Sequence, residues 1–289
     1  MSGPATSGRT DPTAGPGPWP PPIEGLWVVD LDGVVWLAGE AIAGAPDAIA
    51  RLRRRGADIL FATNNSSPTT SELLARLARI GIPADGGDLV TSAQAAASVV
   101  PRGARVVILG DEGLREALAQ RQVTSVLEGP ADAVVVGWAR DFDFELLNRA
   151  AAAVRGGARL VGTNEDPTHP TPTGLVPGTG AILAAVATAS GTEPFVAGKP
   201  HTPFVDLVVA AADRKGREIG AVVGDRPSTD GATARLLGVP FGLVLTGVSG
   251  GVPRTSHIAE VSEPVPDAVA EDLAALVAGV AGVAEADPD

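Results

Sequence analysis

Short apolar runs alternate with longer amphipathic segments from about residue 23 to residue 280, and this alternation constrains the fold more than any other feature of the sequence. Each apolar run is expected to form a buried strand, and each amphipathic segment a helix. The expected strands are Leu26–Leu31, Asp58–Thr63, Leu89–Val90, Arg105–Leu109, Ala133–Val136, Arg159–Val161, Phe195–Ala197, Ile219–Val223 and Phe241–Leu245. The expected helices are Pro46–Arg55, Thr69–Ile80, one from Ser92, Glu112–Arg121, Asp143–Arg155, one after Thr202, one after Thr229, and one from Asp267 to about Val280. Continuous apolar strands that alternate with helices are typical of a parallel sheet covered on both faces, so the pattern predicts an α/β fold.

The first 22 residues do not share this pattern. They contain seven prolines among Gly, Ser and Thr, a composition that cannot bury apolar surface, so residues 1–22 are expected to form a disordered tail. The chain has no cysteine, which excludes disulfides, thiolate zinc sites and Cys nucleophiles. A net charge of −12 without basic runs argues against nucleic acid or an anionic membrane as the main partner. Because no signal peptide or membrane-spanning run is visible, we expect a cytoplasmic protein.

Ligands of open α/β sheets bind beyond the carboxyl ends of the strands, and two of the expected strands end in pairs of carboxylates. Asp30 and Asp32 close the first strand, and Asp225 and Asp230 follow the strand Ile219–Val223. Buried carboxylates without a cation are costly, and Mg²⁺ prefers a few carboxylates together with water and substrate phosphate oxygens. Asp30 and Asp225 are therefore candidate Mg²⁺ ligands, although an Asp-rich capping turn is the alternative for either string alone.

Two further strand ends carry groups suited to a phosphoryl anion. Thr63 and Asn64 stand where a helix is expected to begin, so that a hydroxyl and backbone N–H groups could receive an anion, although such a cluster also fits an ordinary helix cap. Lys199 follows another apolar strand in a chain whose 22 basic residues include only two lysines, which suggests that a compact point charge is required there. The other lysine, Lys215, is expected in a solvated loop. A phosphate dianion beside two carboxylates totals about −4, and Mg²⁺ with one lysine returns about +3.

In this order, the strings DLDGVVW, FATNNSS, AGKP and GDRPSTDG resemble the four motifs of the haloacid-dehalogenase-like superfamily. The strings GTNEDPTHP, PGTGA and VLTGVSG are similar to the NagD-type, 4-nitrophenylphosphatase branch, which carries a class IIA cap. The resemblance implies roles for the candidate residues. Asp30 would be the nucleophile, Asp32 the general acid/base, Thr63 and Asn64 phosphoryl binders, and Lys199 the charge neutraliser. Asp30, Asp32 and Asp225 would also form the Mg²⁺ site, which Asp230 would support. The chain departs from the family pattern at Pro227-Ser228, where many members have Leu-Asp.

The resemblance also implies a Rossmann-like parallel-sheet core formed by residues 23–100 and 194–289, with an inserted α/β cap at residues 101–193. The spacing independently leaves room for an insertion, because Thr63 and Lys199 are much further apart in the chain than the other neighbouring motifs. Family caps contact the leaving group, so His169 is a candidate substrate contact, with an ordinary loop histidine as the alternative. Caps of this type often pair, and a homodimer through the cap is therefore expected.

Together these residues predict a Mg²⁺-dependent phosphomonoester hydrolase that acts on a small phosphometabolite through an aspartyl-phosphate intermediate. A dehalogenase uses no metal and lacks the second carboxylate, so Asp32 argues against that reaction. Two alternatives stay open: a phosphate-ester-binding regulator without turnover, and a phosphomutase or phosphotransferase on the same fold. Family members act on glycerol phosphate, phosphoglycolate, pyridoxal phosphate, nucleotides and sugar phosphates, and the sequence does not select among them.

Overall fold

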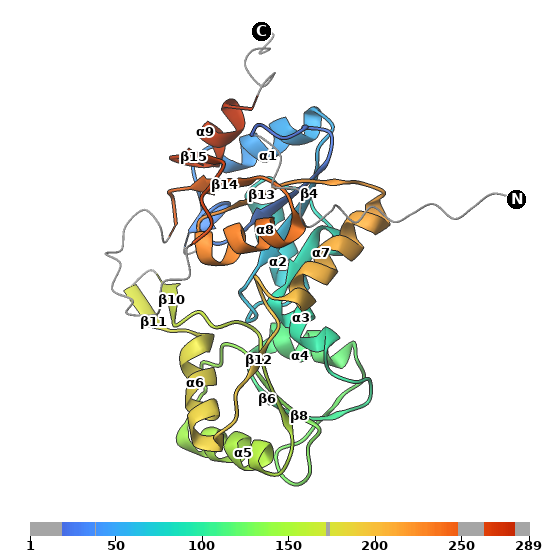
Figure 1. Cartoon of the computed structure of the whole chain (residues 1–289), viewed down its shortest axis with the longest axis vertical. Helices are drawn as coiled ribbons and strands as arrows, with labels where there is room; N and C mark the ends of the chain where they lie inside the picture. The colour runs from blue at the N-terminus through green and yellow to red at the C-terminus, as the bar shows by residue number, and fades with distance from the viewer. Residues whose placement is uncertain (1–18, 38, 172–173, 248–262, 281–289) are drawn as a thin grey trace, which may run out of the picture. The chain divides into compact units, whose positions relative to one another are not determined.

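The computed structural model describes residues 19–37, 39–171, 174–247 and 263–280. The chain divides into two compact units (Figure 1). The first comprises residues 1–37, 41–60 and 209–289, and the second comprises residues 38–40 and 61–208. The strands and helices are numbered in chain order, and Figure 1 labels many of them.

A six-stranded sheet runs in the order β15-β14-β13-β1-β4-β5. Its strands are β1 (Leu26–Asp30), β4 (Asp58–Thr63), β5 (Leu89–Thr91), β13 (Ile219–Gly224), β14 (Phe241–Val244) and β15 (Ala268–Ala270). β1 pairs with β13, β13 with β14, β14 with β15 and β4 with β5, all in parallel. The helices of the first unit include α1 (Ala45–Arg54), α8 (Ala232–Leu237) and α9 (Leu273–Ala278). β2 (Trp36–Leu37) and β3 (Glu40–Ala41) form a separate two-stranded sheet.

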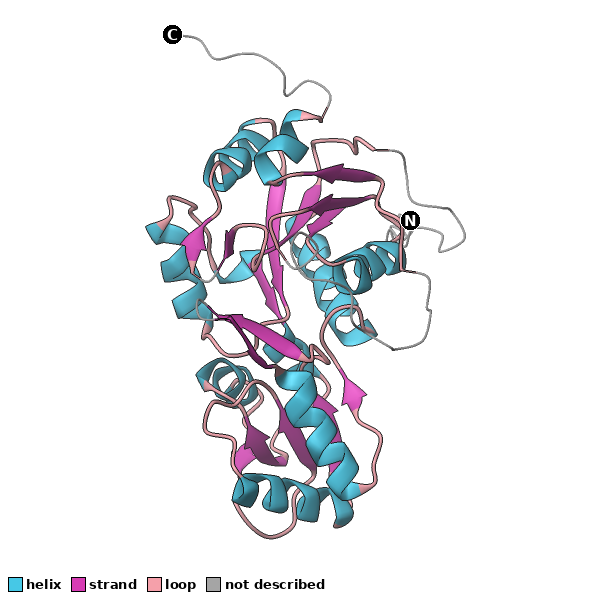
Figure 2. Ribbon diagram, turned by 90° about the vertical axis from the view of Figure 1, so that its left-hand side faces the viewer, coloured by secondary structure: helices cyan, strands magenta, loops and turns pink. Residues whose placement is uncertain are grey.

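The second unit contains its own five-stranded sheet, in the order β12-β9-β8-β6-β7. Its strands are β6 (Arg105–Leu109), β7 (Thr124–Ser125), β8 (Ala133–Val136), β9 (Arg159–Gly162) and β12 (Phe195–Val196). The helices are α2 (Thr70–Arg79), α3 (Ser92–Ser98), α4 (Glu112–Ala119), α5 (Phe144–Arg155) and α6 (Thr179–Ser190), and α7 (Thr202–Lys215) crosses the boundary between the units. An antiparallel hairpin of β10 (Thr168–Thr171) and β11 (Gly174–Pro177) stands beside this parallel arrangement. Figure 2 shows helices along the strands of each sheet, and the predicted α/β class is confirmed.

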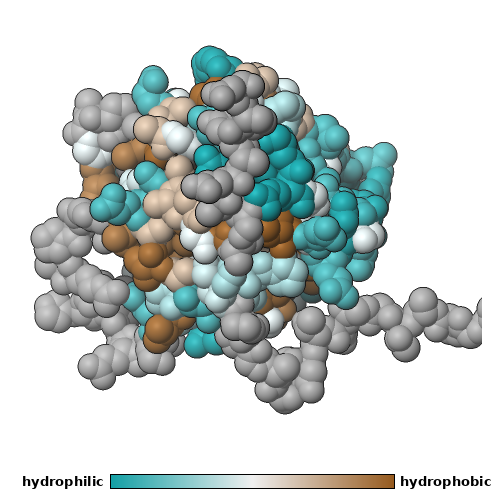
Figure 3. All heavy atoms as spheres, turned by 90° about the horizontal axis from the view of Figure 1, so that it is seen from above, coloured by the Kyte–Doolittle hydropathy of each residue, from teal (hydrophilic) through white to brown (hydrophobic). Residues whose placement is uncertain are grey.

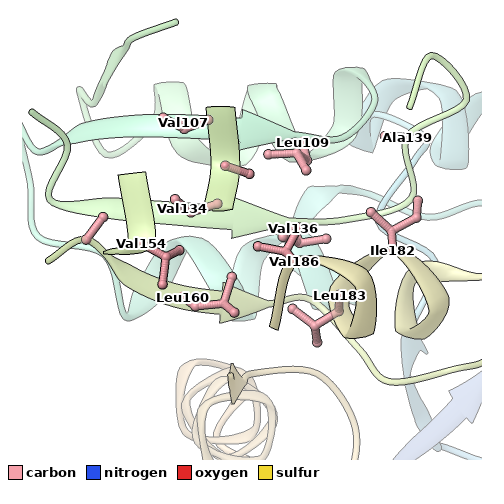
Figure 4. Packing of buried hydrophobic residues seen from close by; sticks show 12 residues of the cluster. Val107, Leu109, Val134, Val136, Ala139, Val154, Leu160, Ile182, Leu183 and Val186 are labelled. Atoms are coloured by element: carbon pink, nitrogen blue, oxygen red, sulfur yellow. The ribbon is translucent and has the colours of Figure 1, made fainter. Parts of the chain in front are cut away.

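The core of the second unit lies between its sheet and two helices. Val107, Val134 and Leu160 come from three neighbouring strands, and Val154 of α5 and Val186 of α6 pack against them (Figure 4). All five side chains are almost fully buried. This unit therefore has a hydrophobic core of its own, as is typical of a domain.

Two local expectations were wrong, and one helix was not anticipated. Residues 268–270 form β15 rather than the start of a helix, because their backbone pairs with β14, and α9 begins only after its cap residue Asp272, whose Oδ1 accepts the Ala275 N–H at 2.8 Å. α6 was not anticipated, because its residues are small or apolar on all sides and show little 3.6-residue periodicity. Lys215 is the last residue of α7 rather than part of a loop.

The first described residues also differ from expectation. Residues 1–18 of the expected tail lie outside the described residues, but Trp19 packs edge-on against Trp27 of β1, with 5.9 Å between ring centroids. Pro21 is buried as well. Trp19 and Pro21 therefore pack against the fold ahead of the expected start at residue 23.

Large hydrophobic side chains are exposed at separate places in both units, including Phe144, Leu127 and Val265. On the face drawn in Figure 3, hydrophobic residues lie in several patches among hydrophilic ones. Within the described ranges, no helix combines the length and the apolar character that crossing a membrane requires.

Candidate active site

Three carboxylates form a compact acidic cluster in the first unit. Asp30 ends β1, Asp225 directly follows β13, and Asp230 lies in the turn Pro227–Gly231 that leads into α8. β1 and β13 are parallel neighbours, so their carboxyl ends meet at the same edge of the sheet. The three side chains are buried, and one oxygen from each lies within 4.8 Å of the others.

The backbone of two glycines closely approaches the Asp225 carboxylate. A Cβ atom added to Gly33, whose φ is +88°, would lie 2.7 Å from Asp225 Oδ2, and one added to Gly247 would lie 2.0 Å from the same atom. Only glycine fits at either position, because real Cβ atoms do not approach so closely. The close approach of two backbone segments therefore defines the position of this carboxylate.

The acidic cluster fits a hard divalent cation. Three carboxylates in a buried site repel one another and are costly to desolvate unless a cation accompanies them. The available donors are all oxygen atoms, which Mg²⁺ prefers, and a small octahedral ion leaves further positions for water and a phosphate oxygen. Asp230, expected only as a support, belongs to the cluster, whereas Asp32 is not among the carboxylates that the described residues bring together there.

Asp32 lies nearby in sequence but has different surroundings. It is half-buried, and its Oδ1 accepts a hydrogen bond from the indole Nε1 of Trp36 at 3.0 Å. The tight turn between the two residues is closed by the Gly33 N–H, which donates to the Trp36 carbonyl at 2.7 Å. Trp36 was not among the predicted site residues, although its place four residues after Asp32 in DLDGVVW was a local signal.

The other predicted residues, Thr63, Asn64 and Lys199, lie in the second unit. Thr63 ends β4 and is buried, and its Oγ1 accepts the Asn65 N–H at 3.0 Å. The Asn64 side chain contacts the Lys199 main chain twice: Oδ1 accepts the Lys199 N–H at 2.8 Å, and Nδ2 donates to the Lys199 carbonyl at 3.2 Å. Lys199 is 3% exposed, and its Nζ donates to the Ala62 carbonyl at 3.3 Å.

Two more side chains hold the Asn64 main chain. The Asn64 carbonyl accepts hydrogen bonds from Ser92 Oγ and from Asn164 Nδ2, each at 2.7 Å. Both donors are buried. They join the segments that follow β4, β5 and β9 in one polar network, and in the sequence Ser92 and Asn164 each follow an expected strand.

The three histidines have separate surroundings. The ring of His169, on β10, lies against that of Trp138 with 4.3 Å between centroids, and the Arg140 guanidinium lies 5.0 Å from the centre of the Trp138 ring. His201 Nε2 lies 3.5 Å from Glu165 Oε2, and the interaction with His201 lowers the pKa of the Glu165 carboxyl below its ordinary value, against an opposing effect of burial. His257 lies outside the described residues.

Comparison with known proteins matches two parts of the chain to family models. Residues 27–124 match the haloacid dehalogenase-like hydrolase model, and residues 196–276 match a HAD-hydrolase-like model. The acidic cluster and the segment after β4 both fall within these ranges. Residues 125–195, which include most of the five-stranded sheet, lie between them.

Individual proteins extend the match over most of the chain. The D-glycerol 3-phosphate phosphatase of Mycobacterium tuberculosis is 39% identical over 257 residues, covering 86% of this chain and 70% of that protein. A crystal structure of the glycerol phosphate phosphatase from the same organism, in complex with magnesium, has a TM-score of 0.76 and 37% identity, covering 88% of this chain and 77% of that one. The p-nitrophenyl phosphatase of Archaeoglobus fulgidus has a TM-score of 0.77 and 32% identity, covering 89% and 99% of the two chains.

These matches confirm the resemblance to the 4-nitrophenylphosphatase branch and the predicted fold of a parallel-sheet core with an inserted α/β cap. The two family models include Asp30, Thr63, Lys199 and Asp225, and the match to the M. tuberculosis phosphatase covers most of the chain. On sequence identity, coverage and fold together, the chain belongs to the haloacid dehalogenase-like hydrolase family.

Proposed function

We propose that this protein hydrolyses phosphate monoesters of small metabolites, with Mg²⁺ as cofactor. The buried cluster of Asp30, Asp225 and Asp230 carries the proposal, because three anions at one sheet edge require a cation and Asp30 would be the attacking group. The relatives named as phosphatases support the same activity. When bound, Mg²⁺ neutralises the charge of the carboxylates and of the substrate phosphate, so that the two anions can meet.

In this proposal a carboxylate oxygen of Asp30 attacks phosphorus in line, and the bond between phosphorus and the ester oxygen breaks. Asp32 donates its proton to the departing alkoxide. Asp32 then accepts a proton from water, whose oxygen attacks the aspartyl-phosphate and releases inorganic phosphate, which regenerates Asp30. Thr63 would bind phosphoryl oxygens and Lys199 would neutralise their charge.

Asn64 supports this step indirectly in the proposal. Its side-chain oxygen and nitrogen are both hydrogen-bonded to the Lys199 main chain, so its contribution would be to hold Lys199 in place. Asp32 was expected to hold the metal as well, but we assign that role to Asp230 because it belongs to the acidic cluster.

The proposed cap covers residues 101–193, with the core at residues 23–100 and 194–289. The cap is supported by four of the strands of the five-stranded sheet, β6 to β9, and by the hydrophobic core that packs against them. His169 is proposed as a substrate contact on this cap, next to Trp138. A homodimer through the cap and a cytoplasmic location complete the proposal, and sedimentation equilibrium and cell fractionation test them.

The activity is tested with p-nitrophenyl phosphate in the presence of Mg²⁺ and of EDTA. We expect turnover only with Mg²⁺, and Asp30→Asn should lower kcat by about a thousandfold or more with folding intact, because the amide cannot attack phosphorus. Asp47→Asn, an exposed position on α1, is the matched control and should keep full activity.

Full activity in EDTA, or Asp30→Asn activity within tenfold of the control, would refute the proposal. Phosphate-ester binding without turnover would favour the regulator. Return of the phosphoryl group to a second hydroxyl of the substrate would favour the phosphomutase.

A further inference from the structure

Two tryptophans of the first unit are fully buried, but their indole nitrogens differ. Trp36 Nε1 donates to Asp32 Oδ1 at 3.0 Å. Trp27 Nε1 has no hydrogen-bond partner among the described residues. Both indole rings are thus buried, but only the Trp36 N–H is hydrogen-bonded to a carboxylate.

The chemistry of the indole determines what this contact does. Indole Nε1–H is a donor and never an acceptor, so the Asp32 oxygen that faces it must accept. When Asp32 carries a proton, a hydrogen on Oδ1 would oppose the Trp36 N–H. Because a carbonyl oxygen accepts better than a hydroxyl oxygen, the contact favours the proton on Oδ2 and one of the two rotational orientations of the carboxyl group.

We propose that Trp36 is a positioning residue that reserves Oδ2 of Asp32 for proton transfer to the leaving group. The turn that joins the two residues supports this role. The Trp36 N–H donates to the Leu31 carbonyl at 3.1 Å, and the Gly33 N–H donates to the Trp36 carbonyl at 2.7 Å. Donor and acceptor are thus fixed to the same short backbone loop.

The inference rests on the proposed role of Asp32 as general acid. The Trp36 contact should therefore affect the rate only for substrates whose leaving group needs a proton. An alkyl phosphate has a basic leaving group that needs a proton as it departs, whereas p-nitrophenolate leaves without one. Loss of the Trp36 N–H should slow hydrolysis of alkyl esters and leave aryl esters almost unaffected.

The test compares Trp36→Phe with Trp27→Phe, because each removes one indole N–H from a fully buried ring. We expect Trp36→Phe to lower kcat about tenfold on glycerol phosphate, with less than about a twofold change on p-nitrophenyl phosphate, since the hydrogen bond that orients the proton donor is lost. KM should stay within about twofold on both esters, because the contact acts on the proton and not on substrate binding. Trp27→Phe should change the two esters equally.

A ring-size effect at Trp36 is separated by placing 3-benzothienylalanine at residue 36, which keeps the shape of the indole and replaces only the N–H by sulfur. The same selective loss on glycerol phosphate supports the proposal. An equal effect on both esters, or no effect, overturns it. This variant also decides the matter where Trp36→Phe fails to fold.

Asp32→Asn distinguishes failure of this inference from failure of the proposed function. If Asp32→Asn slows both esters equally, Asp32 is not the proton donor and the proposed function is wrong at that step. If Asp32→Asn is selective for the alkyl ester and the residue-36 variants are not, only the role of Trp36 is wrong.

Discussion

Lys199→Arg keeps the charge at its site and should still impair the enzyme. Lys199 is 3% exposed, and the Asn64 side chain holds its main chain at both the N–H, at 2.8 Å, and the carbonyl, at 3.2 Å. The backbone therefore cannot shift easily to admit a larger, planar guanidinium. Overpacking of this kind typically costs about 1–3 kcal/mol of stability.

The catalytic loss has a separate cause. The ammonium group is a point charge with three donors, and the Lys199 Nζ already uses one of them on the Ala62 carbonyl at 3.3 Å. A guanidinium at the same site spreads its charge over a fork and cannot place one positive point beside the phosphoryl oxygens. We expect kcat/KM to fall by more than about tenfold, which corresponds to about 1.4 kcal/mol of transition-state stabilisation.

Lys215→Arg is the control, since this lysine is the last residue of α7 and is only half-buried. Either cation suits a helix C-terminus, so the change in stability should stay within about 0.5 kcal/mol. Both variants are assayed with p-nitrophenyl phosphate at saturating Mg²⁺, and thermal unfolding is recorded for each. If Lys199→Arg is as active as Lys215→Arg, the argument for a compact charge is wrong even where hydrolysis itself is established.

Two further changes test the metal site. Asp225→Ala removes one carboxylate from the acidic cluster and should raise the Mg²⁺ concentration for half-maximal activity by about tenfold or more; an unchanged Mg²⁺ titration would contradict the role of Asp225 as a metal ligand. Ca²⁺ should inhibit the unmodified enzyme, because its looser coordination misplaces the reacting groups. Gly247→Ala should weaken Mg²⁺ activation in the same assay, because its Cβ would lie 2.0 Å from Asp225 Oδ2, whereas Gly86→Ala, whose Cβ meets its nearest neighbour at 3.9 Å, should leave activation unchanged. Equal Mg²⁺ dependence of these two alanine variants would show that the glycine backbone does not define the position of Asp225.

Much of the architecture was predictable because it depends on local pattern. β4, β6 and β8 have the bounds that their apolar runs predicted, because a strand that is apolar on both faces is stable only in a sheet covered on both faces. Asp30 and Asp225 were recognisable for the same reason: each is a charged residue at the end of such a run, and parallel strands bring those ends to one edge.

The tertiary structure decided which polar groups meet. That Asn64 holds Lys199, and that Ser92 and Asn164 hold Asn64, depends on segments that are distant in the chain, and no local periodicity encodes such contacts. Residues 268–270 form the strand β15 because their backbone groups hydrogen-bond to those of β14. This long-range pairing outweighs a local sequence that is compatible with a helix. The sequence by itself therefore determined which reactive side chains are present and which strand ends carry them. Long-range packing and hydrogen bonding selected the partner of each side chain, because contact between distant residues depends on the folded backbone and not on the local sequence.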